Sequence, residues 1–581
     1  MRKMMQWVFA ATLIISGLSV LTACSSGDDN NNNPPVQPAD DGGNSGVPTS
    51  KITYIDHGKY GYEKEEEEVT TSAQWLNAAT VVEGQPLGIK GDWYVTGYGE
   101  INEPIKATYH LRIILCDDAV LKVKSIIVEG VNNLIINGQK RGTGQLIIDD
   151  PKDGCPGIGP DEHGGGYVEI HGGNITAKGS TGCAAIGGGH HDGQNLSFSK
   201  ISIYGGVINA TGGDGAAGIG GGVLSVMDGE ILIYGGDIHA QGGGYTVSFS
   251  SNGGAGIGGG CNSPARRVII MGGNIHATGG REAAGIGCGQ GAETSGYNDC
   301  GHIDIYDGYV EAYGKDHAAG IGGGDGVYLD EISIRSGTIK AYGGVNAAGI
   351  GGGEGAKGGR INISGGTVYA YAGADGAGIG GGEDGDGGTI TISGGLVFAY
   401  GNHHSDGFGA GICGGQDGNS GTITISGGEV HAYGGDDAAG IGTGEATTSG
   451  PNIKADNITI SGGAVEAVGG GKGAGVGAGQ DAEVGTITIT MDSGSVYVSG
   501  RSGNDCGWWA GAFGAYDEDD RGTLNIGKGV KTMSIEKDYS WSTIPVAWNP
   551  VAFAQQRCHV LIQTCDHPGG HTAETCVFCK H

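Results

Sequence analysis

A short glycine-rich segment centred on Gly-Ile-Gly recurs along most of the chain, and this repeat limits the possible folds more than any other feature. Close copies, such as GDGAAGIGGG and DHAAGIGGG, centre on Ile219, Ile257, Ile286, Ile321, Ile350, Ile379, Ile412 and Ile441. Looser copies centre on Ile158, Ile186 and Val476, and a degenerate last copy on Phe513. Adjacent copies lie 28 to 38 residues apart. A repeat of that length is typical of solenoid proteins.

Between copies, two short segments alternate apolar and polar residues, as in GTITISGG followed by EVHAYGG. Alternation at period two predicts strands, and each repeat therefore predicts two strands, glycine corners and a very short third strand at the Gly-Ile-Gly isoleucine. A single such turn cannot bury its inward side chains, so successive turns must stack and pair in parallel at about 4.8 Å. We predict an all-β fold, a right-handed parallel β-helix (solenoid) of about a dozen or more coils, followed by a small Cys/His-rich tail.

Composition agrees with a tight coil and excludes several other classes. The chain has 128 glycines but only 14 prolines and no Gly-x-y period, which excludes collagen. Glycine supplies the positive φ angles of tight corners. Strings of the form G-x-G-x-x-G do not open a helix of a βαβ unit, so a nucleotide-binding loop is not predicted. A formal net charge of −31 opposes binding to nucleic acid.

The N-terminus carries Arg2 and Lys3, an apolar run over 7–20, and then Leu-Thr-Ala ahead of Cys24. This segment resembles bacterial lipoprotein signal peptides that end in a lipobox. The resemblance implies cleavage of residues 1–23 and acylation of Cys24, whose acyl chains would anchor the protein in a membrane. The alternative is an ordinary secretory signal with an incidental cysteine.

Residues 24–50 are rich in Asn, Pro, Gly and Asp, which predicts a flexible tether. Acidic residues behind Cys24 resemble the surface-export signal of some Gram-negative lipoproteins. The expected location is therefore the outer membrane, exposed at the cell surface, with a periplasm-facing tether as the alternative. No later segment is long and apolar enough to span a membrane, so membrane contact is expected only through the lipid anchor.

The rest of the chain divides into an N-terminal cap at 51–104, the β-helix at 105–523 and a C-terminal segment at 524–581. The segment HLRIILCDDAVLKVKSIIVEGVNNLIINGQKRGTGQLII predicts the first coils, since it has the strand spacing without the Gly-Ile-Gly corner. With the serial ITISGG and AGIGGG turns, it resembles bacterial surface β-helix repeat proteins over about residues 105–515. That class is described as carbohydrate-binding or adhesin-like, and it offers no catalytic motif to transfer.

Aromatic residues recur on the outward side of the second strand, where the pattern x-V-x-A-x turns Val and Ala inward. Five successive turns place a tyrosine at the same outward position: Tyr313, Tyr342, Tyr371, Tyr400 and Tyr433. Two residues earlier stand Glu311, Lys340, Tyr369, Phe398 and His431. Rings in register suit stacking against sugars, so the tyrosines with Tyr369, Phe398 and His431 are the candidate ligand-binding residues. An aromatic ladder that only stabilises the coil is the alternative.

Acidic residues recur in the loops beside the Gly-Ile-Gly corner. Those before it are Asp214, Glu282, Asp316, Asp375, Asp436 and Asp437, and those behind it are Glu354, Glu383, Asp384, Asp386 and Asp417. Carboxylates clustered with backbone carbonyls are Ca²⁺ ligands, but no ligand spacing repeats. Calcium binding and simple solvation both stay open.

The C-terminal tail contains Cys565, His567, Cys576 and Cys579 in the spacing C-x-H-x₈-C-x-x-C. These side chains would satisfy a tetrahedral zinc ion. Disulfides compete outside the cytosol, and removal of the lipidated Cys24 from thirteen cysteines leaves an even number. Zinc, disulfides and free thiols therefore all stay open for this tail.

The leading functional hypothesis is a surface lipoprotein that binds a polysaccharide, host glycan or matrix through the flank of the β-helix. The first alternative is a polysaccharide lyase or glycoside hydrolase on the same fold, which would need convergent carboxylates or a basic residue in a groove. The second is a structural surface scaffold for a protein partner. Two features that could suggest catalysis do not support it. The motif YIDHGK at 54–59 precedes the coil, and the loop histidines at 190–191 and 403–404 have no repeated partner. No catalytic residue is assigned, and enzymatic activity stays open.

Overall fold

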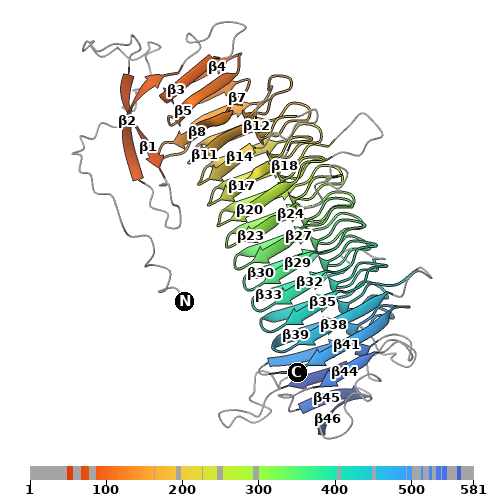
Figure 1. Ribbon diagram of the computed structural model, residues 1–581. Coiled ribbons are helices and arrows are strands. Elements are labelled where there is room, and N and C mark those ends of the chain that lie inside the picture. Colours follow the sequence, from red (N-terminus) through yellow and green to blue (C-terminus); the bar gives the residue numbers. More distant parts are fainter. Residues whose placement is uncertain are drawn as a thin grey trace, which may run out of the picture.

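Each repeat forms one coil of a long rod (Figure 1). The computed structural model describes residues 49–56, 67–76, 87–161, 164–190, 198–225, 227–244, 253–291, 300–401, 407–447, 453–491, 494–499, 512–514, 522–526, 532–537, 540–545 and 559–563. Within these ranges all regular secondary structure is β-strand. The expected all-β parallel β-helix is confirmed. No helix long and apolar enough to cross a bilayer occurs in the described ranges.

A first column of strands, called face A, is formed by the first strand of each coil. Its members are β3 (Leu87–Val95), β5 (Ile105–Leu115), β8 (Gly130–Gly138), β11 (Gly165–Ile170), β14 (Phe198–Ile203), β17 (Met227–Ile233), β20 (Ala265–Ile270), β23 (His302–Ile305), β26 (Glu331–Ile334), β29 (Arg360–Ile363), β32 (Thr389–Ile392), β35 (Thr422–Ile425), β38 (Lys454–Ile460), β41 (Glu483–Ile489) and β44 (Thr523–Ile526).

A second column, called face B, contains the strand that follows in each coil. Its members are β4 (Tyr98–Ile101), β6 (Val120–Val123), β9 (Gln145–Ile148), β12 (Asn174–Lys178), β15 (Val207–Thr211), β18 (Asp237–Gln241), β21 (Asn274–Thr278), β24 (Tyr309–Tyr313), β27 (Thr338–Tyr342), β30 (Thr367–Tyr371), β33 (Leu396–Tyr400), β36 (Glu429–Tyr433), β39 (Gly463–Val468) and β42 (Gly494–Ser499).

The third column, called the corner column, consists of two-residue strands. Its members are β7 (Ile126–Ile127), β10 (Ile158–Gly159), β13 (Ile186–Gly187), β16 (Ile219–Gly220), β19 (Ile257–Gly258), β22 (Ile286–Gly287), β25 (Ile321–Gly322), β28 (Ile350–Gly351), β31 (Ile379–Gly380), β34 (Ile412–Cys413), β37 (Ile441–Gly442), β40 (Val476–Gly477) and β43 (Phe513–Gly514). The degenerate repeat at Phe513 is therefore a true corner, paired with Val476.

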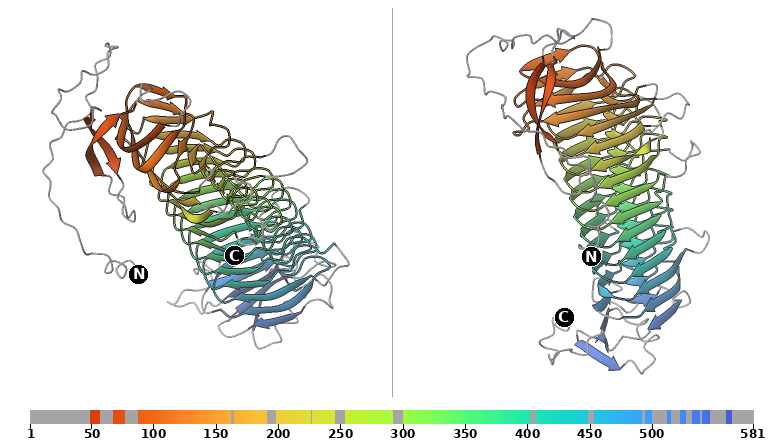
Figure 2. Two further views of the ribbon diagram at one scale, coloured as in Figure 1. Left: turned by 45° about the horizontal axis from the view of Figure 1, so that its top comes forward. Right: turned by 60° about the vertical axis from the view of Figure 1, so that its left-hand side comes forward.

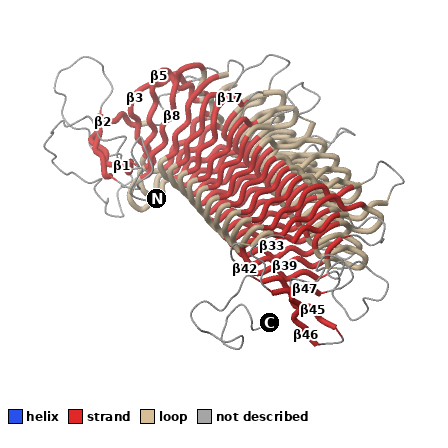
Figure 3. The backbone as a smooth tube through the Cα atoms, turned by 60° about the horizontal axis from the view of Figure 1, so that its bottom comes forward, coloured by secondary structure: helices blue, strands red, loops and turns tan. Residues whose placement is uncertain are grey.

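Each strand pairs in parallel with the equivalent strand of the next coil (Figure 2). On face B, for example, Ala312 is opposite Ala341, and in the corner column Ile321 is opposite Ile350. Equivalent residues of successive repeats therefore lie directly above one another. Parallel pairing includes β3 with β5 and β4 with β6, so stacking begins at Leu87, upstream of residue 105. Strands form the broad faces, and many of the loops gather along one edge (Figure 3).

The core consists of aliphatic side chains that point inward from all three strand columns. Ile321, Ile350 and Ile379 of the corner column are fully buried, as are Val310 and Ala312 of face B. Burial of one such isoleucine stabilises the fold by roughly 1.5–3 kcal/mol. Since no single coil encloses its own core, this stabilisation exists only when neighbouring coils are in place.

Close approach of successive coils explains why glycine follows the corner isoleucine. At Gly351 the backbone has φ +136°, and a Cβ atom there would lie 1.9 Å from the carbonyl oxygen of Gly380 in the next coil. Both the conformation and the contact exclude a side chain. Ile127 and Cys413 are the exceptions in the column. Cys413 has φ +119° and a side chain that contacts the Ser420 carbonyl.

Both ends of the rod carry antiparallel strands. At the N-terminal end β1 (Thr49–Asp56) pairs antiparallel with β2 (Glu67–Trp75), and β2 continues onto β3. At the other end β47 (His559–Gln563) lies antiparallel to β42 and to β45 (Thr532–Lys537), which also pairs with β46 (Ser540–Pro545). Such additions cover edges that would otherwise recruit strands from other molecules.

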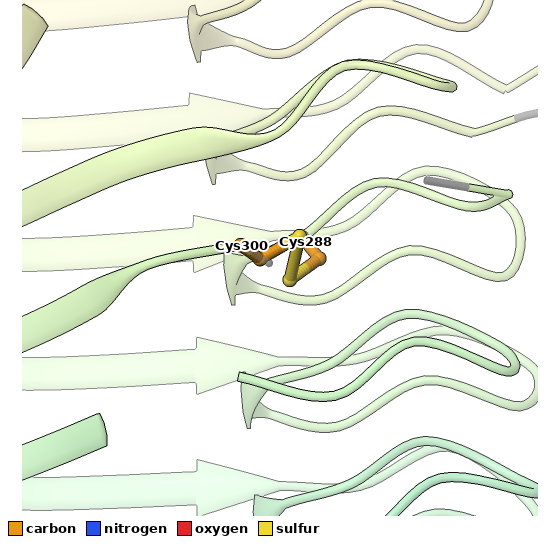
Figure 4. The surroundings of a disulfide bond; sticks show 2 residues. All are labelled: Cys288 and Cys300. Carbon is orange, nitrogen blue, oxygen red and sulfur yellow. A yellow bond between two sulfur atoms is a disulfide. The ribbon is translucent and has the colours of Figure 1, made fainter. Parts of the chain in front are cut away.

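A disulfide joins Cys288, just after β22, to Cys300, just before β23 (Figure 4). Both cysteines are buried, and the bond links the end of the corner strand directly to the start of the next face A strand. Cys183, Cys261 and Cys413 are buried thiols. Burial raises the pKa of the Cys261 thiol to about 11 and also raises the pKa of Cys413.

We expect Gly351→Ala to destabilise the coil strongly, because the new Cβ meets backbone that cannot move without disturbing the next coil. The free energy of unfolding should fall by at least about 3 kcal/mol. Gly355→Ala is the matched control, since it has φ +67° but open space around the Cβ position, and it should cost about 1–2 kcal/mol. Urea denaturation followed by circular dichroism measures both; equal losses would contradict the close-approach explanation.

Thiol accessibility tests the burial of the cysteines. In the native protein at pH 8, Cys261 and Cys413 should resist iodoacetamide, because both are buried and a raised pKa leaves little thiolate. Cys288 and Cys300 should become labelled only after reduction and denaturation. Peptide mass spectrometry gives the labelled fraction at each site, and rapid native labelling of Cys413 would disprove its burial.

Candidate ligand-binding flank of the β-helix

The five predicted tyrosines lie in one row on face B because their strands pair in register. Tyr313, Tyr342 and Tyr371 are direct partners across β24, β27 and β30, and the row continues to Tyr400 and Tyr433. We call this row the tyrosine ladder. The alternating pattern expected from the sequence is therefore correct: Val310 and Ala312 face the core while the tyrosines face outward.

Neighbouring rings of the tyrosine ladder stack on one another. Their centroids are 4.7, 4.9, 5.0 and 5.2 Å apart, with interplanar angles of 5 to 13°. Such stacking contributes about 0.5–1.5 kcal/mol per pair. It also covers the ring faces inside the row, so the ladder presents ring edges and phenol groups outward. Only its two end rings lack a tyrosine on one side.

The outward column beside the tyrosine ladder contains a lysine at Lys340 and aromatic side chains in the coils that follow. Tyr369 stacks on Phe398 at 5.0 Å, and Phe398 stacks on His431 at 4.6 Å. Lys340 stands in the preceding coil, with its ammonium 5.4 Å from the Tyr309 ring centroid. The candidate residues Tyr369, Phe398 and His431 thus form a second, shorter aromatic row beside the tyrosine ladder.

A glutamate and a histidine stand at each end of the tyrosine ladder. At the start, the Tyr313 hydroxyl donates to Glu311 Oε1 at 2.8 Å, and Glu311 Oε2 lies 3.2 Å from His276 Nδ1. At the other end, the Tyr433 hydroxyl donates to Glu466 Oε2 at 2.9 Å. The same Glu466 oxygen lies 2.6 Å from His431 Nδ1, and His431 Nε2 lies 3.1 Å from Glu429.

Electrostatics keep the ladder hydroxyls protonated. Burial raises the pKa of Tyr342, Tyr371 and Tyr400 above the ordinary tyrosine value. For Tyr313 and Tyr433 the upward shift of the pKa is larger, because burial is joined by the hydrogen bond to a glutamate. The ladder therefore offers neutral phenol groups that can donate and accept hydrogen bonds.

Sequence reasoning missed the groups that flank the ladder, including His276, Tyr309 and Glu466. Their signal was present. His276 and Glu466 extend the column of Glu311 and His431 by one coil at either end, and Tyr309 is an outward residue of the first ladder strand. It also missed a stack just after the ends of the face A strands β11, β14 and β17, where the ring of Tyr204 lies between those of His171 and Tyr234 at centroid distances of 4.5 and 4.7 Å. His171 and Tyr204 are buried, so this stack supports the coil rather than a ligand.

The acidic loops beside the corner column contain paired and crowded carboxylates. Glu354 pairs with His317 and accepts a hydrogen bond of 2.9 Å from Asn346, while Lys472 lies 3.3 Å from Asp437. Burial, and then neighbouring acids, raise the pKa of Glu383. Within the described residues no three His, Cys, Asp or Glu side chains form a group able to hold a metal ion. The calcium hypothesis gains no geometric support there.

Several predicted sites lie outside the described residues. These are the lipidation site Cys24, the zinc candidates Cys565, His567, Cys576 and Cys579, and the histidine pair at 403–404. Of the motif at 54–59, Tyr54 is buried in β1, with the Arg112 guanidinium 4.9 Å from its ring centroid. That contact places Tyr54 in the packing of the N-terminal cap.

Comparison with known proteins supports the coil. The family model described as beta helix repeat matches residues 168–190, 201–223, 268–290, 303–325, 332–354, 361–383, 390–416 and 423–445. Each matched segment covers a face A strand, a face B strand and a corner strand. No curated protein and no solved structure matches the chain.

Proposed function

We propose that this β-helix repeat protein binds an extended, uncharged glycan along face B, with the sugar chain lying across the tyrosine ladder. The β-helix repeat is compatible with adhesion, carbohydrate binding and polysaccharide degradation. The observation that favours binding is the ladder itself, five phenol groups in register at steps of 4.7 to 5.2 Å.

A repeating row of identical groups favours a repeating ligand. The step between rings is close to the length of one sugar residue in an extended β-1,4-linked polysaccharide. A chain lying along the rod would therefore meet an equivalent phenol group at each sugar. Contacts that are weak singly would add up, because the row is rigid before binding and loses little conformational entropy.

The contact would use ring edges and hydroxyls rather than ring faces, since the faces inside the ladder cover one another. Phenol groups hydrogen-bond to sugar hydroxyls, and ring edges pack against sugar C–H groups. This differs from the face-on stacking that the sequence suggested. It makes the hydroxyl of each tyrosine the group that recognises the ligand.

Charge favours a neutral ligand. The chain carries a net −31, and Glu311 and Glu466 stand at the two ends of the ladder. Lys340 is the one lysine within the five strands that carry the ladder. An anionic polysaccharide would be repelled by this distribution. Neutral glycans of a host surface or of the diet carry no such penalty.

We also propose that the protein is displayed outside the cell through a lipid on Cys24 and the tether at 24–50. The lipobox sequence supports this location. The disulfide between Cys288 and Cys300 is consistent with a compartment outside the reducing cytosol. A rod on a flexible tether would present the whole length of face B to large polymers.

The triple variant Tyr342→Phe, Tyr371→Phe and Tyr400→Phe tests ligand recognition. It removes three outward hydroxyls but keeps the stacked rings, so the melting temperature should change little. If each lost hydrogen bond costs about 0.5–1.5 kcal/mol, affinity should fall at least about tenfold. Isothermal titration with hexasaccharides of β-1,4-linked glucose, mannose and N-acetylglucosamine measures it.

A second triple variant replaces the same three tyrosines by serine. This change also removes the stacking, so it should lower both affinity and melting temperature. If the wild-type protein binds a hexasaccharide and neither triple variant loses affinity, the ladder is not the binding site and serves only to stabilise the coil.

The anchor prediction concerns Cys24. In a Gram-negative host that processes lipoproteins, the wild-type protein should fractionate with the outer membrane and enter the detergent phase. Cys24→Ser lacks the acylated thiol and should appear in the soluble fraction. Unchanged membrane partitioning of this variant would rule out the lipid anchor.

A further inference from the structure

The two ends of the tyrosine ladder are not equivalent. Tyr313 has Tyr342 stacked on one side, but its partner in the preceding coil is Thr278. A threonine side chain is too short to cover the outer part of a phenol ring. The partner of Thr278 in the coil before is Gln241, which is also not aromatic. The side chain at Thr278 therefore projects less far from face B than the ring of Tyr313. We call this change in the surface the step at Tyr313.

Exposure agrees with an uncovered ring at this step. Tyr313 is 37% exposed, and the other four ladder tyrosines are half-buried. At the far end, the partner of Tyr433 is the apolar Val468, and Glu466 of the same strand bonds to both Tyr433 and His431. The ring at that end is half-buried and so is less exposed than the ring of Tyr313.

Polar groups surround the step at Tyr313. Glu311 accepts hydrogen bonds from the hydroxyls of Tyr313 and Tyr309, at 2.8 and 3.3 Å. His276 lies 3.2 Å from Glu311 and is held by stacking on His239, with ring centroids 4.9 Å apart. The carboxylate is therefore fixed in place beside the ring, with remaining lone pairs able to accept from a ligand hydroxyl.

We infer that Tyr313, Thr278, Glu311 and His276 form a ledge that holds one neutral hexopyranose ring face-on against the uncovered side of Tyr313. An apolar C–H face of the sugar would pack on the phenol ring above Thr278, and its hydroxyls would meet Glu311 and His276. Sugar sites commonly combine one aromatic platform with a few fixed polar groups in this way.

This inference rests on the proposed function, because it takes a glycan as the ligand, and it adds a fixed starting point to the ladder. A chain lying along the ladder would meet equivalent groups at every step and could slide by one sugar. A ring seated on the ledge stops that sliding, because Tyr313 is the more exposed of the two end rings and has a fixed glutamate and histidine beside it. The ledge therefore sets the register of the bound chain.

The test is Thr278→Tyr, which adds a sixth ring in register with the ladder and covers the ledge. The probe is the hexasaccharide of β-1,4-linked glucose, mannose or N-acetylglucosamine that binds the wild-type protein. We expect affinity to fall by about three- to tenfold while the melting temperature stays equal or rises, since a new stacked pair forms. Thr278→Val is the matched control, which keeps the step and should keep the affinity.

A second variant tests the ledge independently, so that the result does not depend on the folding of Thr278→Tyr. Tyr313→Leu keeps an apolar side chain at the step but has no flat ring, so it should weaken binding to a similar extent. Unchanged or tighter binding by both variants, with weaker binding by the Tyr→Phe triple variant, would overturn the ledge and leave the proposed function standing. If none of the three hexasaccharides binds the wild-type protein, the proposed function fails and the ledge fails with it.

Discussion

The close parallel contact between successive coils is the interaction on which the rest of the structure depends. Corner strands such as β25, β28 and β31 approach so closely that a Cβ atom after the isoleucine would overlap the next backbone. Glycine at that position lets the backbones pair, and pairing in turn closes the isoleucine column from water. The high glycine content is therefore a requirement of packing, not a sign of flexibility.

The same contact explains why so much of the fold could be predicted from the sequence. In-register pairing converts a spacing along the chain into a position in space, so Ile321 and Ile350 could be placed in one column from their motifs alone. Even the atypical Val476 and Phe513 corners follow the rule. The start of the coil was harder to locate, because β3 and β4 stack in parallel without the Gly-Ile-Gly motif.

The candidate site could be predicted only in part. Alternation and register were enough to place the five tyrosines in one outward row, but they carry no information about side-chain torsions. Whether Tyr342 turns its ring face to solvent or to Tyr371 depends on rotamers that the pattern does not encode. The roles of Glu311 and Glu466 also escaped the sequence, because each depends on contact with a histidine of the preceding coil.

Because each coil pairs only with the coils before and after it, the length of the rod is not fixed by its architecture. Unequal recombination between the repeats of a gene could insert or delete whole coils while leaving every remaining interface intact. A lineage could in this way lengthen or shorten its tyrosine row, one ring at a time, without redesigning a core. In such a scaffold the number of coils sets the length of the surface that can contact a ligand, and that number can change by whole coils.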